Sequence, residues 1–270
     1  MSANLDLHYT NLVIKKQIIP NYSYIYSSTN ENLKKIFSEI DVSSKDALCV
    51  AASGDQAFYF LNNGVGNIDL FDINKLTLHY FYLRMWFIKY LDVFYPHVYN
   101  YDKKQMKKLL DLVVPETLEE SYYYSYWYNF VKKFSEKKGD LIFRNVWECD
   151  DYNNIEDLSN LREKFNEFKF DFYNVDFSSE VDTSKKYDII YVSNIVDWLR
   201  NKKIDITLYA ENLNRLLKED GFAIGTNVVY SSYGGSDMDI LGKYFECVPF
   251  KSIDERYCGK RSPGYCLIRK

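Results

Sequence analysis

Short apolar runs recur along the chain and predict buried strands. Residues 47–52, 67–72 and 187–193 are rich in aliphatic and aromatic side chains and are bounded by glycine or polar turns. Apolar residues at helical spacing over residues 55–62 and 206–218 predict helices between such runs. Strands that alternate with helices predict an α/β fold with a doubly wound, mainly parallel, Rossmann-like sheet. Further strands are expected at residues 170–175, 221–229, 241–250 and 265–268, and further helices at residues 30–40 and 75–95.

The segment of residues 97–168 interrupts this alternation. Its charged, amphipathic pattern predicts helices and no strand. Because it is too long for a simple connection, we interpret it as a helical insertion. We expect residues 1–45 to form a helical or irregular cap, and residues 46–270 to form the α/β domain that carries the insertion. The expected insertion helices are residues 103–112, 116–137 and 155–168.

Composition narrows the function classes. The 270 residues carry a formal net charge of -4 and no dense basic run, so nucleic acid is not an expected partner. The five cysteines are scattered and only three histidines are present, which argues against a metal site and is typical of a reduced, cytoplasmic protein. Arg84, Lys89 and Asp92 interrupt the apolar stretch of residues 76–99, so no membrane span is predicted. Peripheral contact with a membrane stays compatible with this composition.

The first two expected strands end in chemically distinctive residues. The first runs into a turn at Ser53, Gly54 and Asp55, and the second ends at Asp72, roughly 20 residues further on. In a nucleoside-binding βαβ unit, an acid in this place accepts hydrogen bonds from the ribose hydroxyls. The alternative for Asp72 is to cap the helix that follows, a role that Asn74 also suits. The chain therefore has the layout of a nucleoside site.

The turn favours a cationic nucleoside that lacks phosphate. A dinucleotide site uses three glycines to bring the backbone against a pyrophosphate, and here Gly54 is the single glycine. The carboxylate of Asp55 lies at the helix start, where it would repel a phosphate, face a cation or cap the helix. S-adenosylmethionine is the common nucleoside of this kind, and we expect it to be the donor substrate. The same two strand ends supply the other expected contacts, Ala52, Ser53, Ile73 and Asn74.

Three segments resemble class I S-adenosylmethionine-dependent methyltransferase folds: Ser53-Gly54-Asp55-Gln56, Phe71-Asp72-Ile73-Asn74 and the strand end at residues 188–195. More narrowly, they resemble the betaine lipid synthase relatives, over residues 22–95 and 170–230. That resemblance implies transfer of the 3-amino-3-carboxypropyl group to a small-molecule or lipid head-group nucleophile, with methylthioadenosine as by-product. The lipid enzymes carry an early Gln and a Trp-Glu-Asp element before the first strand, whereas this chain reads Tyr-Ser-Tyr-Ile-Tyr-Ser-Ser over residues 22–28. A methyltransferase and a non-catalytic nucleoside-binding protein are the alternatives.

Residues at later strand ends complete the expected site. Asp176 follows the third expected strand, where this fold commonly places an acid near adenine, although a surface aspartate is an equally ordinary interpretation. Ser193 and Asn194 lie at the carboxyl end of a strongly apolar strand, beside the crevice where ligands bind in open α/β sheets. Asp197 and Tyr26 are the candidates for accepting the proton of an acceptor amine. The alternative for Asp197 is to cap the helix that follows.

Aromatic residues mark further candidate contacts. Residues 122–128 place tyrosines and a tryptophan around an expected insertion helix, which is typical of packing on two sides. The alternative is a lid whose ring faces contact the sulfonium. Tyr22, Tyr24 and Tyr26 are candidates for closing the pocket, and the loop at residues 230–235 is a candidate for contacting the acceptor.

Overall fold

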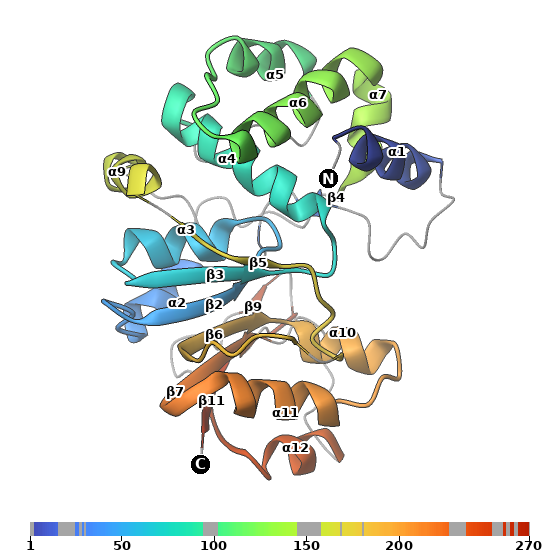
Figure 1. Ribbon diagram of the computed structural model, residues 1–270. Coiled ribbons are helices and arrows are strands. Elements are labelled where there is room, and N and C mark those ends of the chain that lie inside the picture. Colours follow the sequence, from blue (N-terminus) through green and yellow to red (C-terminus); the bar gives the residue numbers. More distant parts are fainter. Residues whose placement is uncertain are drawn as a thin grey trace. The chain divides into compact units, whose positions relative to one another are not determined.

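The structure is a computed structural model that describes residues 3–15, 25–26, 29, 31–93, 102–144, 158–167, 169–179, 181–226, 236–249, 256–257, 260–261 and 264–269. The chain divides into two compact units, whose elements are labelled in Figure 1. The helical unit comprises Met1–Asn30, Ala51–Asp55 and Asn74–Phe168, and the sheet unit comprises Glu31–Val50, Gln56–Ile73 and Lys169–Lys270. The domain boundary expected at residue 45 stays a prediction.

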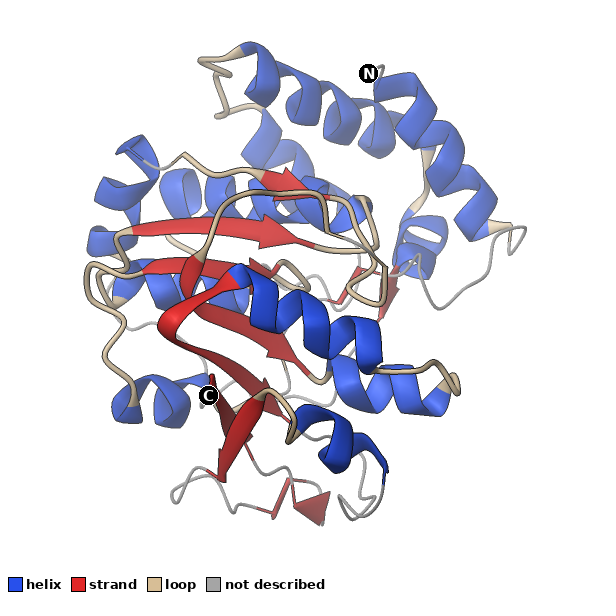
Figure 2. Ribbon diagram, turned by 60° about the horizontal axis from the view of Figure 1, so that its bottom comes forward, coloured by secondary structure: helices blue, strands red, loops and turns tan. Residues whose placement is uncertain are grey.

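A mixed sheet forms the centre of the sheet unit. Its strands are β2 (Asp46–Val50), β3 (Asn67–Phe71), β5 (Phe172–Tyr173), β6 (Tyr187–Ser193), β7 (Leu217–Thr226), β8 (Phe245–Pro249) and β11 (Gly264–Arg269). They are arranged in the order β5-β3-β2-β6-β7-β11-β8. Figure 2 shows the strands in red and the helices in blue. The first five run parallel to one another, whereas β11 is antiparallel to both β7 and β8. Val50 pairs with Phe71 and Cys49 pairs with Tyr191, so β2, β3 and β6 have their carboxyl ends at one edge.

The direction of winding reverses between β2 and β6. On one side α3 (Asp55–Asn62) connects β2 to β3, and on the other side α10 (Ile195–Asn201) and α11 (Thr207–Leu216) connect β6 to β7. A sheet that winds outward in both directions is doubly wound, so the predicted α/β, mainly parallel, Rossmann-like fold is confirmed. The sheet unit also contains α2 (Leu33–Glu39), α12 (Ser236–Leu241) and a two-stranded ribbon of β9 (Arg256–Tyr257) and β10 (Lys260–Arg261).

The central strands are apolar at successive positions because both faces of the sheet are covered. Leu48 and Cys49 of β2 are buried, and so are Ile189, Ile190 and Tyr191 of β6. This burial explains why both strands are recognisable in the sequence as uninterrupted apolar runs.

Helices dominate the helical unit. They are α1 (Ala3–Ile14), α4 (Leu76–Leu91), α5 (Lys103–Leu110), α6 (Leu118–Lys133), α7 (Glu136–Gly139) and α9 (Ser159–Glu167), with the 3-10 helix η2 (Asp140–Ile142). α6 packs against α1, α4 and α5. A short parallel pair joins β1 (Ile25–Tyr26) to β4 (Phe143–Arg144). The expectation that residues 100–168 hold no strand is therefore wrong at β4, because a two-residue strand shows no periodicity and its partner is distant in sequence.

α4 is buried along most of its length. Every residue from 76 to 88 is buried, including Arg84. No helix among the described residues is long and apolar enough to cross a membrane. The helix ends at Leu91, earlier than the predicted residue 95, because Asp92 adopts the left-handed conformation (φ 56°) and its N–H donates to the Phe87 carbonyl oxygen.

Candidate functional site

Asp72 follows β3 directly, at the carboxyl edge of the sheet. Its N–H donates to the Tyr173 carbonyl oxygen (3.1 Å), and its own carbonyl oxygen accepts from Asn174 Nδ2 (2.8 Å). Asn174 Nδ2 also donates to the Ile73 carbonyl oxygen (3.0 Å). The Asp72 side chain is 8% exposed and that of Ile73 is 39% exposed. The backbone of this strand end is therefore fixed, with a buried acid followed by an exposed apolar residue.

Glu31, a residue that was not predicted, organises the neighbouring strand ends. Its buried carboxylate accepts hydrogen bonds from Ser193 Oγ (2.7 Å) at the end of β6 and from Thr226 Oγ1 at the end of β7. Its other oxygen accepts from Tyr191 Oη (3.0 Å) and from Gln56 Nε2 (2.8 Å) in the first turn of α3. Nothing in the pattern around residue 31 indicates this role, because all four donors are distant in sequence.

Glu31 also affects the protonation of Tyr191, one of its four hydrogen-bond donors. Burial, together with the charge and hydrogen bond of Glu31, raises the pKa of Tyr191 well above its ordinary value. The phenol therefore stays protonated and donates to the carboxylate. A carboxylate that accepts four hydrogen bonds compensates much of the cost of its own burial.

Two predicted residues have unusual backbone conformations. Ser193 has φ 52° at the end of β6, and Ala52 has φ 41° just after β2. A left-handed conformation costs roughly 1–3 kcal/mol in a residue other than glycine, and such conformations concentrate at functional sites. Gly54, with φ 88°, adopts the same region without this cost, and its N–H donates to the Ala51 carbonyl oxygen (2.6 Å). We refer to residues 51–55 as the Gly54 turn.

An ion pair with no solvent exposure anchors the Gly54 turn within the helical unit. Arg84 Nη1 of α4 donates to Asp55 Oδ1 (2.6 Å) and to the Ser53 carbonyl oxygen (2.8 Å), and both charged side chains are 0% exposed. Asp55 Oδ2 accepts from Thr29 N–H and from Ser53 Oγ, each at 2.6 Å. Both carboxylate oxygens of Asp55 are thus bonded inside the unit, and its negative charge is compensated by Arg84. The expected contact of Asp55 with a ligand cation stays a prediction.

Two other predicted residues organise local backbone. Asn74 Oδ1 accepts from Leu76 N–H (3.0 Å), so this side chain caps the first turn of α4. Asp176 Oδ1 accepts from the N–H (2.9 Å) and Oγ (2.7 Å) of Ser178 and shapes the turn after β5. Neither contact tests a role in ligand binding.

The remaining predicted site residues lie in different units. Asn194 and Asp197 belong to the sheet unit, where Asn194 follows Ser193 and the buried Asp197 lies in the first turn of α10. Tyr26 belongs to the helical unit, pairs with Arg144 across the β1–β4 ladder and is exposed. Tyr22, Tyr24 and the loop at residues 230–235 lie outside the described residues.

The aromatic side chains of α6 surround a histidine of α4. His79 is buried, with its ring centroid 4.0 Å from that of Tyr126 and 5.0 Å from that of Tyr123. Its Nε2 is 2.9 Å from Asp6 Oδ2 of α1, which also accepts from Tyr122 Oη, while Asp6 Oδ1 accepts from Lys75 Nζ. The inward-facing part of this aromatic cluster therefore packs within the helical unit. The lid interpretation stays a prediction.

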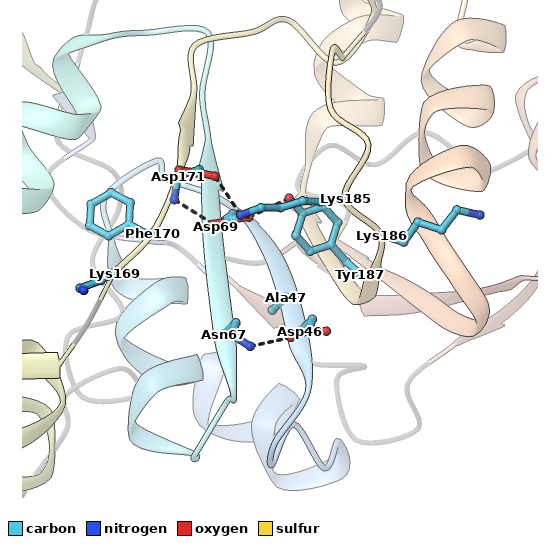
Figure 3. Close-up of a pocket in the computed structure, with 10 residues that line it drawn as sticks. All are labelled: Asp46, Ala47, Asn67, Asp69, Lys169, Phe170, Asp171, Lys185, Lys186 and Tyr187. Atoms are coloured by element: carbon cyan, nitrogen blue, oxygen red, sulfur yellow. Dashed lines mark hydrogen bonds and ion pairs between the residues drawn. The ribbon is translucent and has the colours of Figure 1, made fainter.

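A pocket of about 410 Å³ lies at the opposite, amino-terminal edge of the sheet (Figure 3). Lys185 Nζ bridges Asp69 Oδ2 (2.7 Å) and Asp171 Oδ2 (2.8 Å), and Tyr187 Oη also donates to Asp69 Oδ2 (2.9 Å). Lys169 and Lys186 point away from the centre of this group in Figure 3. Because its central polar groups bond to one another and it lies away from the strand carboxyl ends, this pocket is not the candidate site.

Among the described residues, no group of three or more His, Cys, Asp or Glu side chains is placed to hold a metal ion. No protein-family model matches the chain, and no curated protein matches it significantly.

Solved structures with a similar course of the chain are methyltransferases of low sequence identity. The N-methyltransferase NodS from Bradyrhizobium japonicum WM9, in complex with S-adenosyl-L-homocysteine, is 10% identical with a TM-score of 0.42, over 88% of this chain and 83% of its own. A TehB-like SAM-dependent methyltransferase from Corynebacterium glutamicum is 12% identical with a TM-score of 0.41, over 99% and 97%. Magnesium protoporphyrin IX methyltransferase (ChlM) from Synechocystis PCC 6803, with bound SAM, is 9% identical with a TM-score of 0.42, over 88% and 76%. At these values, the fold assignment rests on the strand order of the sheet unit itself.

Proposed function

We propose that this protein is an S-adenosylmethionine-dependent transferase that moves the 3-amino-3-carboxypropyl group to a small-molecule or lipid head-group nucleophile. The observation that carries the proposal is Asp72 at the carboxyl end of β3, one strand from the reversal between β2 and β6. Open α/β sheets bind nucleosides in the crevice outside the strand carboxyl ends at such a reversal, with an acid on the ribose. The sequence resemblance around Asp72 supplies the choice of donor.

The residues at the strand ends fit the parts of this donor. The carboxylate of Asp72 is the proposed acceptor for the ribose hydroxyls, and Ile73 offers an exposed apolar surface to the adenine. We propose that Asp176, Ser193 and Asn194 contribute the other contacts made by the sheet unit. The Gly54 turn, continuous in sequence with β2, is the proposed place of the methionine moiety, with Ala52, Ser53, Asp55 and Asn74 as its expected contacts.

Arg84 compensates the negative charge of Asp55. The electrostatic repulsion between Asp55 and a phosphate is therefore weaker than the sequence alone indicates, because the carboxylate is paired with a guanidinium. The preference for a phosphate-free donor then depends on the single glycine of the turn, since a pyrophosphate requires closer backbone approach than one glycine allows.

The donor supplies an activated sulfonium, so the protein's own task is to align the acceptor, exclude water and accept a proton. We propose Asp197 and Tyr26 as the groups that accept this proton. Asp197 comes shortly after the Ser193–Asn194 strand end, and Tyr26 is exposed on β1. Methyl transfer is the alternative, because the carbon that faces the acceptor decides which group moves.

Product analysis tests the proposed function. The protein is incubated with S-adenosylmethionine and either a water-soluble metabolite extract or a lipid extract, and the nucleoside products are measured by mass spectrometry. We expect methylthioadenosine in excess of the enzyme-free control. S-adenosylhomocysteine would instead indicate a methyltransferase. Donor binding by calorimetry without either product would indicate a non-catalytic nucleoside-binding protein, and absence of donor binding would contradict all three.

A further inference from the structure

We propose that Arg84 is a positioning residue for donor binding. Its guanidinium holds the Gly54 turn, through Ser53 and Asp55, in the conformation that receives the donor. The inference rests on the proposed function, because that function places the donor's methionine moiety at this turn.

The hydrogen bonds converge on the two residues that flank Gly54. One guanidinium nitrogen of Arg84 binds the backbone carbonyl of Ser53 and the carboxylate of Asp55, and thus bridges the turn from one side of Gly54 to the other. The second carboxylate oxygen of Asp55 ties the turn to Thr29 and to the Ser53 hydroxyl. The backbone of the turn is therefore constrained by contacts from two other segments of the helical unit.

The turn needs such constraint because its backbone is strained. Ala52 adopts φ 41°, a conformation that persists in a residue other than glycine only where the surroundings over-determine it. Arg84 is suited to this task, since its rigid, always charged guanidinium presents several donors in fixed directions, whereas a lysine presents a flexible point charge.

A role in shaping the turn explains the ion pair better than a role in stability alone. Replacing both members of a buried ion pair by well-packed hydrophobic residues of similar volume is often neutral for stability, whereas removing one member leaves an uncompensated charge. An ion pair in which both side chains are 0% exposed is therefore weak evidence of stabilisation. Its position at the predicted donor turn points to control of local conformation.

The test measures binding of S-adenosylhomocysteine by calorimetry, together with melting temperatures. We expect Arg84→Lys to weaken binding roughly tenfold, because the ammonium of a lysine lies one bond closer to the backbone than Arg84 Nη1 and is held less rigidly, so it does not reach Ser53 and Asp55 in the same geometry. The double variant Asp55→Asn/Arg84→Met removes both charges, so we expect it to melt close to the wild type and still bind at least roughly tenfold more weakly.

Arg162→Met is the matched control, because Arg162 bonds the Ile88 carbonyl oxygen and Asp92 on the exposed end of α4. We expect this control to retain wild-type affinity.

The outcomes separate the two proposals. Wild-type affinity in Arg84→Lys and in the double variant would overturn the positioning role, whatever their melting temperatures. If the double variant does not fold, hydrogen exchange of the peptide over residues 51–56 in Arg84→Lys decides: faster exchange with weaker binding supports the role, and unchanged exchange contradicts it. A wild-type protein that does not bind S-adenosylhomocysteine would refute the proposed donor site, and this inference with it.

Discussion

Individual carboxylates at the carboxyl edge of the sheet have different surroundings, and these suggest different roles. Asp72 is buried at a strand end, where its backbone is hydrogen-bonded to Tyr173 and Asn174. Glu31 instead accepts four hydrogen bonds from side chains of the sheet unit. We expect Glu31 to serve the architecture of the strand ends, and Asp72 to serve ligand binding because it lies at a strand end one strand from the reversal of winding.

Replacing Asp72 tests the ribose contact. We expect Asp72→Ala to weaken S-adenosylmethionine binding tenfold or more in calorimetry, because two charged acceptor oxygens are lost, at about 1.5–3 kcal/mol for hydrogen bonds to a charged group. Asp171→Ala is a suitable control, since Asp171 is an aspartate at the opposite edge of the sheet. Equal losses in both variants would contradict the assignment.

Replacing Glu31 tests the strand-end network. We expect Glu31→Ala to lower the free energy of unfolding in urea by about 3 kcal/mol, because it removes the acceptor of the partly buried Ser193 hydroxyl and of the buried donors on Gln56, Tyr191 and Thr226. Glu39→Ala, at an exposed position of α2, is the control and is expected to change stability by less than about 0.5 kcal/mol. A cost as small as that of the control would show that the network is dispensable.

At the scale of elements, the contacts of α1 with α4 and α6 depend on a buried ionic cluster. Burial lowers the pKa of His79 below its ordinary value of 6.5, against the opposing influence of Asp6. Burial acts to raise the pKa of Asp6, but hydrogen bonds from His79, Lys75 and Tyr122 outweigh it and hold this pKa well below 3.8. Both groups therefore bind protons more readily in the unfolded chain.

This linkage predicts loss of stability in acid. The contribution of His79 is complete above about pH 6.5 and declines as the pH falls through that value, and the contribution of Asp6 declines below about pH 4. We expect His79→Gln, whose amide still reaches Asp6, to reduce the fall in melting temperature between roughly pH 7 and pH 5. His8→Gln, at an exposed position of α1, should leave that fall unchanged. An unaltered pH profile in His79→Gln would contradict the prediction.

For the whole molecule, the two edges of the sheet are expected to be separable in function. The amino-terminal edge carries the Lys185 bridge between Asp69 and Asp171, and hydrogen bonds to both aspartates raise the pKa of Lys185 above its ordinary value. We expect Lys185→Met to lower the free energy of unfolding by roughly 1 kcal/mol, a modest amount because Lys185 is half-exposed and solvent screens the pair. Donor affinity should stay at the wild-type value. Weaker donor binding in calorimetry would show that the two edges are coupled.

Much of the fold was predictable because buried segments have an apolar pattern that is recognisable in the local sequence. β6 and α3 occupy the predicted residues 187–193 and 55–62, since a strand covered on both faces and a helix with one buried face impose their own periodicities. The β1–β4 pair was not predictable, because two residues are too few to show a period and the partner strand is remote.

Arg84 in the sequence of α4 indicates a buried ion pair. Arg84 interrupts an otherwise apolar helix, and a charge on a buried helix requires a partner. Arg84 therefore predicts a buried acid somewhere in the chain. The identity of that acid, Asp55, follows only from the folded structure.

The sequence by itself determined the order of strands and helices, the acid at the end of β3 and the single glycine of the turn after β2. Only the tertiary structure decided which side chains meet: Glu31 with Ser193, 162 residues away, and Asp55 with Arg84, 29 residues away. The physical reason is that periodicity records whether a segment is buried, whereas a hydrogen bond depends on the distance between two atoms in space. The Gly54 turn is therefore visible in the sequence as a loop with an acid, and in the structure as a strained loop held by a buried arginine.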